Sequence, residues 1–301
     1  MPTVLESLLD PISPIEFRER YYGKQPLLVR GYPRKFADRF TWDDLNQVLN
    51  TSPYPNPHVE ISSPHQRQQP TSSQSIIEQC RAGSSLIFRQ LELFDPKVGE
   101  LTRALEAEIG EPMFVALVLS PPSQGAFDRH WDRYDGLILH IDGHKAWTVY
   151  DDPAGKPFHN FAEKHGEPPS KPVLECELAP GDLLYVPRGH WHQAVAQRGL
   201  SLHLTFAIKA RTGIDFLTWL VDELRGDVRF GHELPLSFAD EPAELRATRL
   251  REHVTGLGEL LDSRLQDETT IKSYLEHCEI PDRDVRRFNF PAQLLEPDEN
   301  R

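Results

Sequence analysis

Between residues 113 and 210 the sequence is a series of short apolar stretches separated by turn residues, and few folds accommodate this pattern. The stretches run from MFVALVLS to LSLHLTFAI, and the turns between them include SPPSQG, DGHK, APGD and PRGH. No helical period separates the stretches, which disfavours parallel β-α-β units. Many short antiparallel strands instead predict a jelly roll, a β barrel built from two sheets.

Helical patterns precede and follow this β-rich segment. KVGELTRALEAEIG carries its apolar residues on one face, and TWDDLNQVL begins with Thr41, a typical helix N-cap. Beyond residue 211, two apolar stripes have helical spacing: Phe216, Leu217, Leu220, Val221 and Leu224, then Leu250, Val254, Leu257, Leu261 and Leu265. We therefore expect a mainly β fold with helical additions, divided into a jelly-roll domain with N-terminal helices over 1–210 and a helical region over 211–301. The apolar faces of that region suit packing on the barrel or a dimer interface, and the sequence leaves both open.

Charge and cysteine usage narrow the classes of partner. The chain has 33 Lys and Arg against 46 Asp and Glu, a formal net charge of −13. This balance disfavours a nucleic-acid or membrane surface and suits a basic partner or substrate, although solubility alone also explains it. The cysteines are separated and form no C-x-x-C motif, the first residues lack a signal-peptide pattern, and no apolar run approaches the roughly 18 residues of a spanning helix. We expect a soluble, cytoplasmic protein with reduced thiols.

The stretch FDRHWDRYDG indicates a metal site, because His130 and Asp132 would share one face of a strand. A third ligand comes from PRGHWH, where a turn presents His190 and His192 on one face of the next strand. Two imidazoles and one carboxylate on an octahedral ion leave three positions open, as in non-haem Fe(II) oxygenases, whereas zinc hydrolases use such sets in tetrahedral sites. The jelly-roll barrel predicted for this chain favours iron over zinc. We expect His192 to be the ligand because it lies three residues after Gly189, with His190 as the alternative.

An iron oxygenase of this kind takes electrons from a cosubstrate, commonly 2-oxoglutarate, whose far carboxylate needs a cation. Lys145 follows a glycine-containing turn and opens a mostly buried strand beside the expected His-x-Asp strand. A lysine there offers a compact charge with three donors, although a solvated edge lysine would be more ordinary.

These segments resemble those of the Jumonji-C (JmjC) cupin hydroxylases, in particular the bacterial ribosomal-oxygenase-like branch. The resemblance is carried by HWDRYDGLILHIDGHKAW and PGDLLYVPRGHWH, and FRERYYGKQPLLVRG, GSSLIFRQLEL and FLTWLVDELRGDVRFGHELPLSF extend it over nearly the whole chain. It implies iron ligation by His130, Asp132 and His192, with Lys145 binding the 2-oxoglutarate carboxylate. Ser120 approximately matches a polar cosubstrate-binding position, and the resemblance also implies a dimer formed through the helical region.

Residues around this motif set raise further expectations. Ser201, His203 and Thr205 share one face of a strand, and we expect that face to look into the barrel near the cosubstrate, although His203 in a purely structural network fits equally well. The family usually has Gln at His140 and a bulkier apolar residue at Gly136. We expect both to face inward, where they would reshape the pocket or give His140 a role in substrate or oxygen handling.

The resulting hypothesis is an Fe(II)- and 2-oxoglutarate-dependent oxygenase that uses O₂ to hydroxylate a protein or peptide side chain and releases succinate and CO₂. The closest alternatives are the same chemistry on a small molecule, a free amino acid or a natural-product peptide, and N-methyl-lysine demethylation. A non-oxidative metal cupin or a non-catalytic binding module fits less well. Acids near the motifs would suit a basic substrate, although a solvated rim is the plainer interpretation: Asp128, Asp135, Asp142, Asp151 and Asp152. Ribosomal oxygenases end in a winged-helix domain, for which we expect no room after FNFPAQLLEPDENR, and this weakens the case for a ribosomal substrate.

Overall fold

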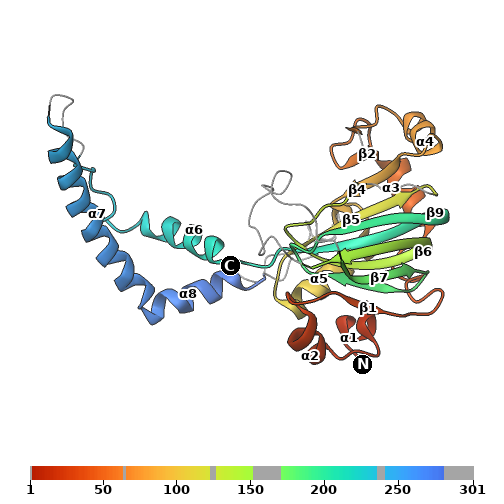
Figure 1. Cartoon of the computed structure of the whole chain (residues 1–301), viewed down its shortest axis with the longest axis horizontal. Coiled ribbons are helices and arrows are strands. Elements are labelled where there is room, and N and C mark those ends of the chain that lie inside the picture. The colour runs from red at the N-terminus through yellow and green to blue at the C-terminus, as the bar shows by residue number, and fades with distance from the viewer. Residues whose placement is uncertain (1, 64–65, 123–126, 152–170, 236–240, 281–301) are drawn as a thin grey trace, which may run out of the picture.

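The computed structural model describes residues 2–63, 66–122, 127–151, 171–235 and 241–280. Its strands pair antiparallel in one nine-stranded sheet in the order β1-β8-β6-β9-β5-β4-β2-β3, with β7 beside β6 (Figure 1). Their bounds are β1 Leu27–Val29, β2 Val59–Ser63, β3 Gln66–Gln68, β4 Ser85–Arg89, β5 Met113–Ser120, β6 Asp135–Tyr150, β7 Pro172–Leu178, β8 Leu183–Val186 and β9 His192–Ile208. The predicted antiparallel β core is confirmed.

The two longest strands, β6 and β9, run through positions where the sequence predicts turns or breaks. The first half of β6 pairs with β8 and β9, and its second half pairs with β7 and β9. The DGHK segment is therefore no turn but an irregular part of β6, where the register against β9 shifts between His140 and Lys145. Gly143 is required there, since its φ is 77° and a Cβ atom would lie 1.9 Å from the Leu200 carbonyl oxygen.

The apolar core extends from the sheet to helices at the N-terminal side of the chain. The largest buried cluster joins strand residues such as Leu117, Leu139 and Phe206 to helical residues such as Leu8 and Leu101. Helix α3 (Trp42–Thr51) begins as predicted at Thr41, whose side chain accepts a hydrogen bond from the Asp44 amide. The remaining helices on this side are α1 Val4–Leu9, α2 Pro14–Glu16, a π-helical turn Phe17–Tyr21, α4 Ser73–Arg81, a 3₁₀ turn Leu91–Leu93 and α5 Pro96–Ile109.

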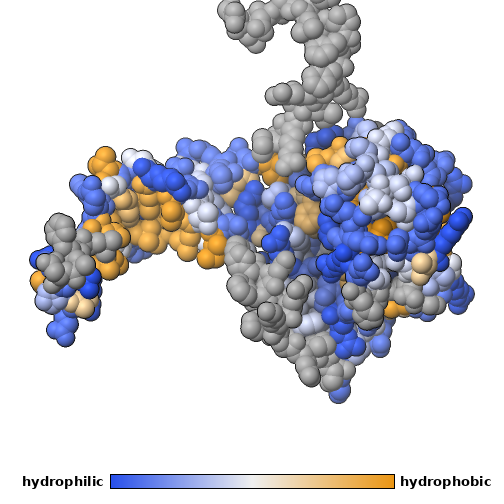
Figure 2. All heavy atoms as spheres, turned by 90° about the horizontal axis from the view of Figure 1, so that it is seen from above, coloured by the Kyte–Doolittle hydropathy of each residue, from blue (hydrophilic) through white to orange (hydrophobic). Residues whose placement is uncertain are grey.

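Three helices after the barrel, α6 (Gly213–Leu224), α7 (Ala243–Leu265) and α8 (Glu268–Cys278), form an arm that extends away from the sheet (Figure 1). Arg211 fixes its base, because the guanidinium donates to the carbonyl oxygens of Gly110 and Cys278, at 2.8 Å each, and to a Glu111 carboxylate oxygen at 2.9 Å. Figure 2 shows apolar side chains gathered along the arm. Among the described residues, no helix combines the length and apolar character that crossing a membrane requires.

Candidate metal centre and adjoining pocket

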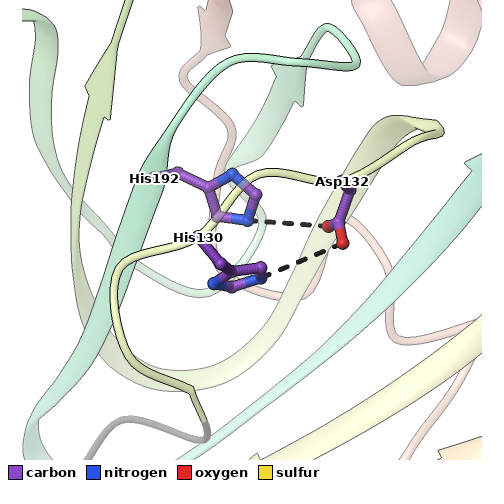
Figure 3. Close-up of side chains that lie close together, drawn as sticks. All are labelled: His130, Asp132 and His192. Atoms are coloured by element: carbon purple, nitrogen blue, oxygen red, sulfur yellow. Dashed lines mark ion pairs between the residues drawn. The ribbon is translucent and has the colours of Figure 1, made fainter. Parts of the chain in front are cut away.

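The side chains of His130, Asp132 and His192 come together, with both imidazole rings facing the Asp132 carboxylate (Figure 3). One potential ligand atom from each lies within 4.8 Å of the others. His130 Nε2 is 3.9 Å from one Asp132 carboxylate oxygen, and His192 Nε2 is 3.6 Å from the other. His190 is not part of this group, so the structure brings together the three residues that the sequence ranks first.

Backbone carbonyl groups hold both imidazoles in the orientation that a metal ion needs. His130 Nδ1 lies 2.7 Å from the Asp128 carbonyl oxygen, and His192 Nδ1 lies 3.0 Å from that of His190. A neutral ring that donates through Nδ1 keeps an unprotonated Nε2, which is the ligand form. Burial, followed by the neighbouring His130, lowers the pKa of His192 to about 4, so its ring is neutral at neutral pH.

The segment that carries His130 and Asp132 is not a strand, contrary to the expectation from the sequence. It is a bent loop with one isolated bridge to β9, in which the backbone amide groups of His130 and His192 each donate to the other residue's carbonyl oxygen. Trp131 packs into a buried cluster with Tyr150 and Trp191. The buried Trp131 ring anchors the loop in which His130 and Asp132 flank it in sequence, and strand alternation is absent there.

A cavity of about 770 Å³ adjoins the metal centre and runs into the barrel. Gly136, Ile138, Lys145 and Trp147, all from β6, line it. The first two positions are even-numbered and the last two odd-numbered, so the irregular segment between them shifts the alternation of side chains by one residue. Strand β9 changes in the same way, from His192 and Ala194 to His203, Thr205 and Ala207. The irregular pairing therefore lets both halves of each strand face one pocket.

Lys145 lies deep in this cavity, with only 1% of its surface exposed. Its ammonium group donates to the Ser120 hydroxyl at 2.9 Å, and Ser85 donates to the same oxygen at 3.1 Å. No carboxylate among the described residues pairs with Lys145, and burial alone lowers its pKa to about 7. A buried cation without a counter-ion is costly for folding, which is typical of a site that binds an anion.

The other candidate residues lie around the same pocket at different depths. His203 and Thr205 line it, whereas Ser201 is buried and does not. His140 is not among the lining residues; its ring lies 6.4 Å from that of His203, and its Nε2 lies 3.0 Å from the Gly143 carbonyl oxygen. Burial, and to a smaller extent Lys145, holds the pKa of His203 well below its usual value.

Trp147 connects the metal centre to the interior histidines. Its ring centroid lies 5.8 Å from that of His192 and 5.8 Å from that of His203. Trp147 Nε1 and His203 Nδ1 are buried and have no hydrogen-bond partner among the described residues. The sequence shows Trp147 only as an apolar strand residue; its place between two histidines depends on the pairing of β6 with β9.

The acids near the motifs do not form an acidic rim in the described part of the chain. Of the five, only Asp135 lines the pocket, where it is buried and accepts hydrogen bonds from the Tyr185 hydroxyl and the Arg188 amide. Asp142 accepts a hydrogen bond from Trp42 Nε1 at 2.7 Å, outside the pocket. Asp152 lies outside the described residues.

Comparison with known proteins agrees with this architecture. Residues 93–216 match the family model described as the JmjC domain. Ribosomal oxygenase 1 of Rattus norvegicus is 31% identical over 262 residues, which is 79% of this chain and 43% of that protein. The protein YxbC of Bacillus subtilis is 28% identical over 257 residues, 76% of this chain and 78% of that one. The chain thus spans less than half the length of the rat relative.

Solved structures show the same fold. The Escherichia coli ribosomal oxygenase YcfD, solved in complex with cobalt and succinic acid, is similar with a TM-score of 0.60 at 19% identity, over 89% of this chain and 71% of that one. The grouping of His130, Asp132 and His192, the JmjC match and these relatives are consistent with one another. The chain therefore contains a JmjC domain over residues 93–216 and is similar to the ribosomal oxygenases over most of its length.

Proposed function

We propose that this chain is an Fe(II)- and 2-oxoglutarate-dependent oxygenase that hydroxylates a side chain of a protein or peptide. One observation carries the proposal: the His130, Asp132 and His192 group lines the same cavity as Lys145, which has no carboxylate partner among the described residues. A metal site alone gives no reason for a buried lysine. An enzyme that binds a dicarboxylate beside its metal ion needs a metal site for one end of that molecule and a cation for the carboxylate at the other end.

The residues present fit both groups. The Nε2 atoms of the two histidines and the Asp132 carboxylate would hold the iron, and Lys145 with Ser120 would bind the far carboxylate of 2-oxoglutarate. The buried donors without partners around the pocket support this fit. Bound iron, 2-oxoglutarate and O₂ supply the oxidising chemistry, with succinate and CO₂ as products.

The chain itself would position the groups that bind the metal ion and would exclude water from the inner side of the site. The Asp128 and His190 carbonyl oxygens orient the two imidazoles through Nδ1, and the buried Trp147 ring closes the inner side of the centre. Asp132, with 57% of its side chain exposed, faces the open side, which leaves access for a substrate side chain. A substrate would therefore approach from the pocket mouth rather than through the barrel.

The names of the relatives support a protein substrate over a small molecule, since both the rat and the Escherichia coli proteins are ribosomal oxygenases. We extend the proposal to a homodimer that forms through the arm. Ile214, Leu217 and Val221 on α6 and Ile271 and Leu275 on α8 expose large apolar side chains. Such a surface suits association with a second copy. A cytoplasmic location fits the three free cysteines.

The test is cosubstrate turnover by the purified protein. With Fe(II), it should convert 2-oxoglutarate to succinate slowly even without substrate, and a non-reactive 2-oxoglutarate analogue should raise the Tm of the Mn(II)-loaded protein. Metal-free protein is the control and should show neither effect. The absence of both effects in the metal-loaded protein would refute the proposed function.

A further inference from the structure

Cationic side chains dominate the mouth of the pocket. Arg67, Arg89, Arg133 and Lys209 all line it. They belong to four separate segments: β3, the end of β4, the loop before β6 and the first residue after β9. Four distant parts of the sequence therefore each contribute one positive charge to a single opening.

Aromatic rings hold three of these cations in place. The Arg67 guanidinium lies 4.8 Å from the centroid of the Phe127 ring, which in turn lies 5.1 Å from that of His130. Arg67 is thus one aromatic ring away from the metal centre. Stacking on a ring fixes the position of a guanidinium without neutralising its charge.

Arg133 and Lys209 also lie beside aromatic rings. The Arg133 guanidinium lies 4.7 Å from the Tyr134 ring centroid, and the Lys209 ammonium lies 5.4 Å from that of Phe114. The two rings contact each other edge to face, with centroids 5.1 Å apart. Both cations are exposed to solvent, where a ligand that enters the pocket would contact them.

Carboxylates do not balance this charge in the described part of the chain. Among the described acidic residues, only Asp132 and Asp135 line the pocket; the first belongs to the metal group and the second is buried and hydrogen-bonded. Glu60 pairs with Arg89 at 3.2 Å and with Arg67 at 3.7 Å, one carboxylate against two guanidinium groups. No described carboxylate forms an ion pair with Arg133 or Lys209, so the described residues at the mouth carry a net positive charge.

This local charge has the opposite sign to that of the whole chain, which is −13. A long polyanion such as a nucleic acid would meet repulsion beyond the mouth, whereas a short acidic segment would contact only the cations. We infer that the substrate is an acidic polypeptide segment, with Asp or Glu flanking the side chain that is oxidised. This inference rests on the proposed function and reverses the expectation of a basic substrate.

Binding of short fluorescent peptides to the Mn(II)- and 2-oxoglutarate-loaded protein tests the inference without requiring turnover. Two pools share a randomised central residue and differ in their flanks, which are rich in Glu in one and in Lys in the other. The Glu pool should bind at least about tenfold more tightly, about 1.4 kcal/mol, and its advantage should shrink as salt rises. Equal binding, tighter binding of the Lys pool, or no binding of either would overturn the inference.

Matched charge reversals locate the effect. Arg133→Glu with Lys209→Glu should weaken binding of the Glu pool by about tenfold or more and leave the Lys pool equal or tighter. The control, Arg81→Glu with Arg198→Glu, makes the same change in net charge at exposed positions that do not line the pocket. An equal loss in the control would refute a role for the mouth. The neutral pair Arg133→Gln with Lys209→Gln should bind the Glu pool with an affinity between those of wild type and the charge reversal. This graded response would separate an effect of charge from misfolding of one variant.

Two further measurements separate the possible failures. The first is competition: a single-stranded oligonucleotide, inorganic phosphate and an unlabelled Glu-rich peptide are each used to displace the bound Glu pool. If the oligonucleotide or phosphate displaces it at a lower concentration than the peptide does, the ligand is another anion and the inferred acidic peptide is wrong. Uncoupled 2-oxoglutarate turnover by the unaltered protein tests the proposed function by itself. Turnover with no preference for the Glu pool would refute only the acidic substrate, and a preference without turnover would refute only the oxygenase.

Discussion

The barrel and the arm place polar and apolar groups in opposite ways. In the barrel, large apolar side chains are buried, and the interior also holds two histidines and a lysine that pairs with no carboxylate among the described residues. In the arm, α7 buries none of its residues, and Val221 and Leu275 are 57% and 63% exposed. Burial of polar groups costs stability, and exposure of apolar groups leaves stabilisation unrealised. Each region therefore departs from the ordinary pattern where it would bind something: a cosubstrate in the barrel, a protein surface on the arm.

The largest expected effect is loss of the metal centre in the barrel. His192→Ala removes one of the three proposed ligands and should abolish stoichiometric Co(II) binding, measured by visible absorption, and with it 2-oxoglutarate turnover. His190→Ala is the matched control, because that residue contributes its backbone carbonyl oxygen to His192 and the substitution keeps it. If His190→Ala lost the metal while His192→Ala retained it, the ligand assignment would be reversed.

Polar substitutions on the arm test the other half of the comparison. Leu217→Asp with Val221→Asp places two charges on the exposed face of α6, and the dimer dissociation constant should rise by about 100-fold or more. Analytical ultracentrifugation measures this change. Co(II) binding by the barrel should be unchanged, and Glu223→Gln, an exposed change on the same helix, should preserve the dimer. A monomeric wild-type protein would contradict the proposed interface.

Lys145 should show the cost of an unpaired charge inside the barrel. Lys145→Met keeps much of the side-chain volume and should raise the free energy of unfolding by on the order of 1–3 kcal/mol, because folding no longer buries an ammonium group. The same variant should bind 2-oxoglutarate at least about tenfold more weakly while it still binds Co(II). Denaturant unfolding and calorimetric titration measure the two effects. A destabilised variant with normal cosubstrate affinity would assign Lys145 a structural role.

Sequence patterns predict the parts of this molecule that depend on neighbouring residues. The PRGH turn, the N-cap at Thr41 and the helical stripes beyond residue 211 all lie in short motifs, and the antiparallel core is predicted from the short apolar stretches between turns. The irregular pairing that brings Gly136 and Lys145 to one pocket is set by contacts between β6 and β9, which are distant in sequence. No local pattern encodes such a register.

The candidate site divides in the same way. The three metal-binding candidates and Lys145 stand out in motifs, whereas the mouth cations come from four segments with no shared signal. The His-x-Asp spacing predicts that the two side chains lie close together, and they do. The reason differs from the expected one, because the segment is a loop with one bridge to β9 and not a strand with alternating side chains.

The smallest predicted effect concerns acid stability and again separates the barrel from the arm. Burial, the largest cause, lowers the pKa of His140 from 6.5 to about 4. Between these values the unfolded chain binds a proton that the folded barrel does not, so the free energy of unfolding should fall as the pH falls from about 6.5 towards 4. The slope from one such group is at most about 1.4 kcal/mol per pH unit, and above pH 6.5 it vanishes.

His140→Asn should therefore change stability near pH 7.5 differently from stability near pH 4.5. At pH 7.5 the variant loses the contact with the Gly143 carbonyl oxygen, so its free energy of unfolding should be slightly lower than that of wild type. At pH 4.5 the variant lacks the buried neutral imidazole whose protonation favours unfolding, and this gain of about 1 kcal/mol or more should offset the loss. His232→Asn, an exposed position between α6 and α7, should leave the pH profile unchanged. Urea unfolding at several pH values measures both profiles. In His140→Asn the free energy of unfolding should still fall with falling pH, but less steeply than in wild type, since His203 is also buried with a lowered pKa. An unaltered slope would exclude His140 as a source of acid sensitivity.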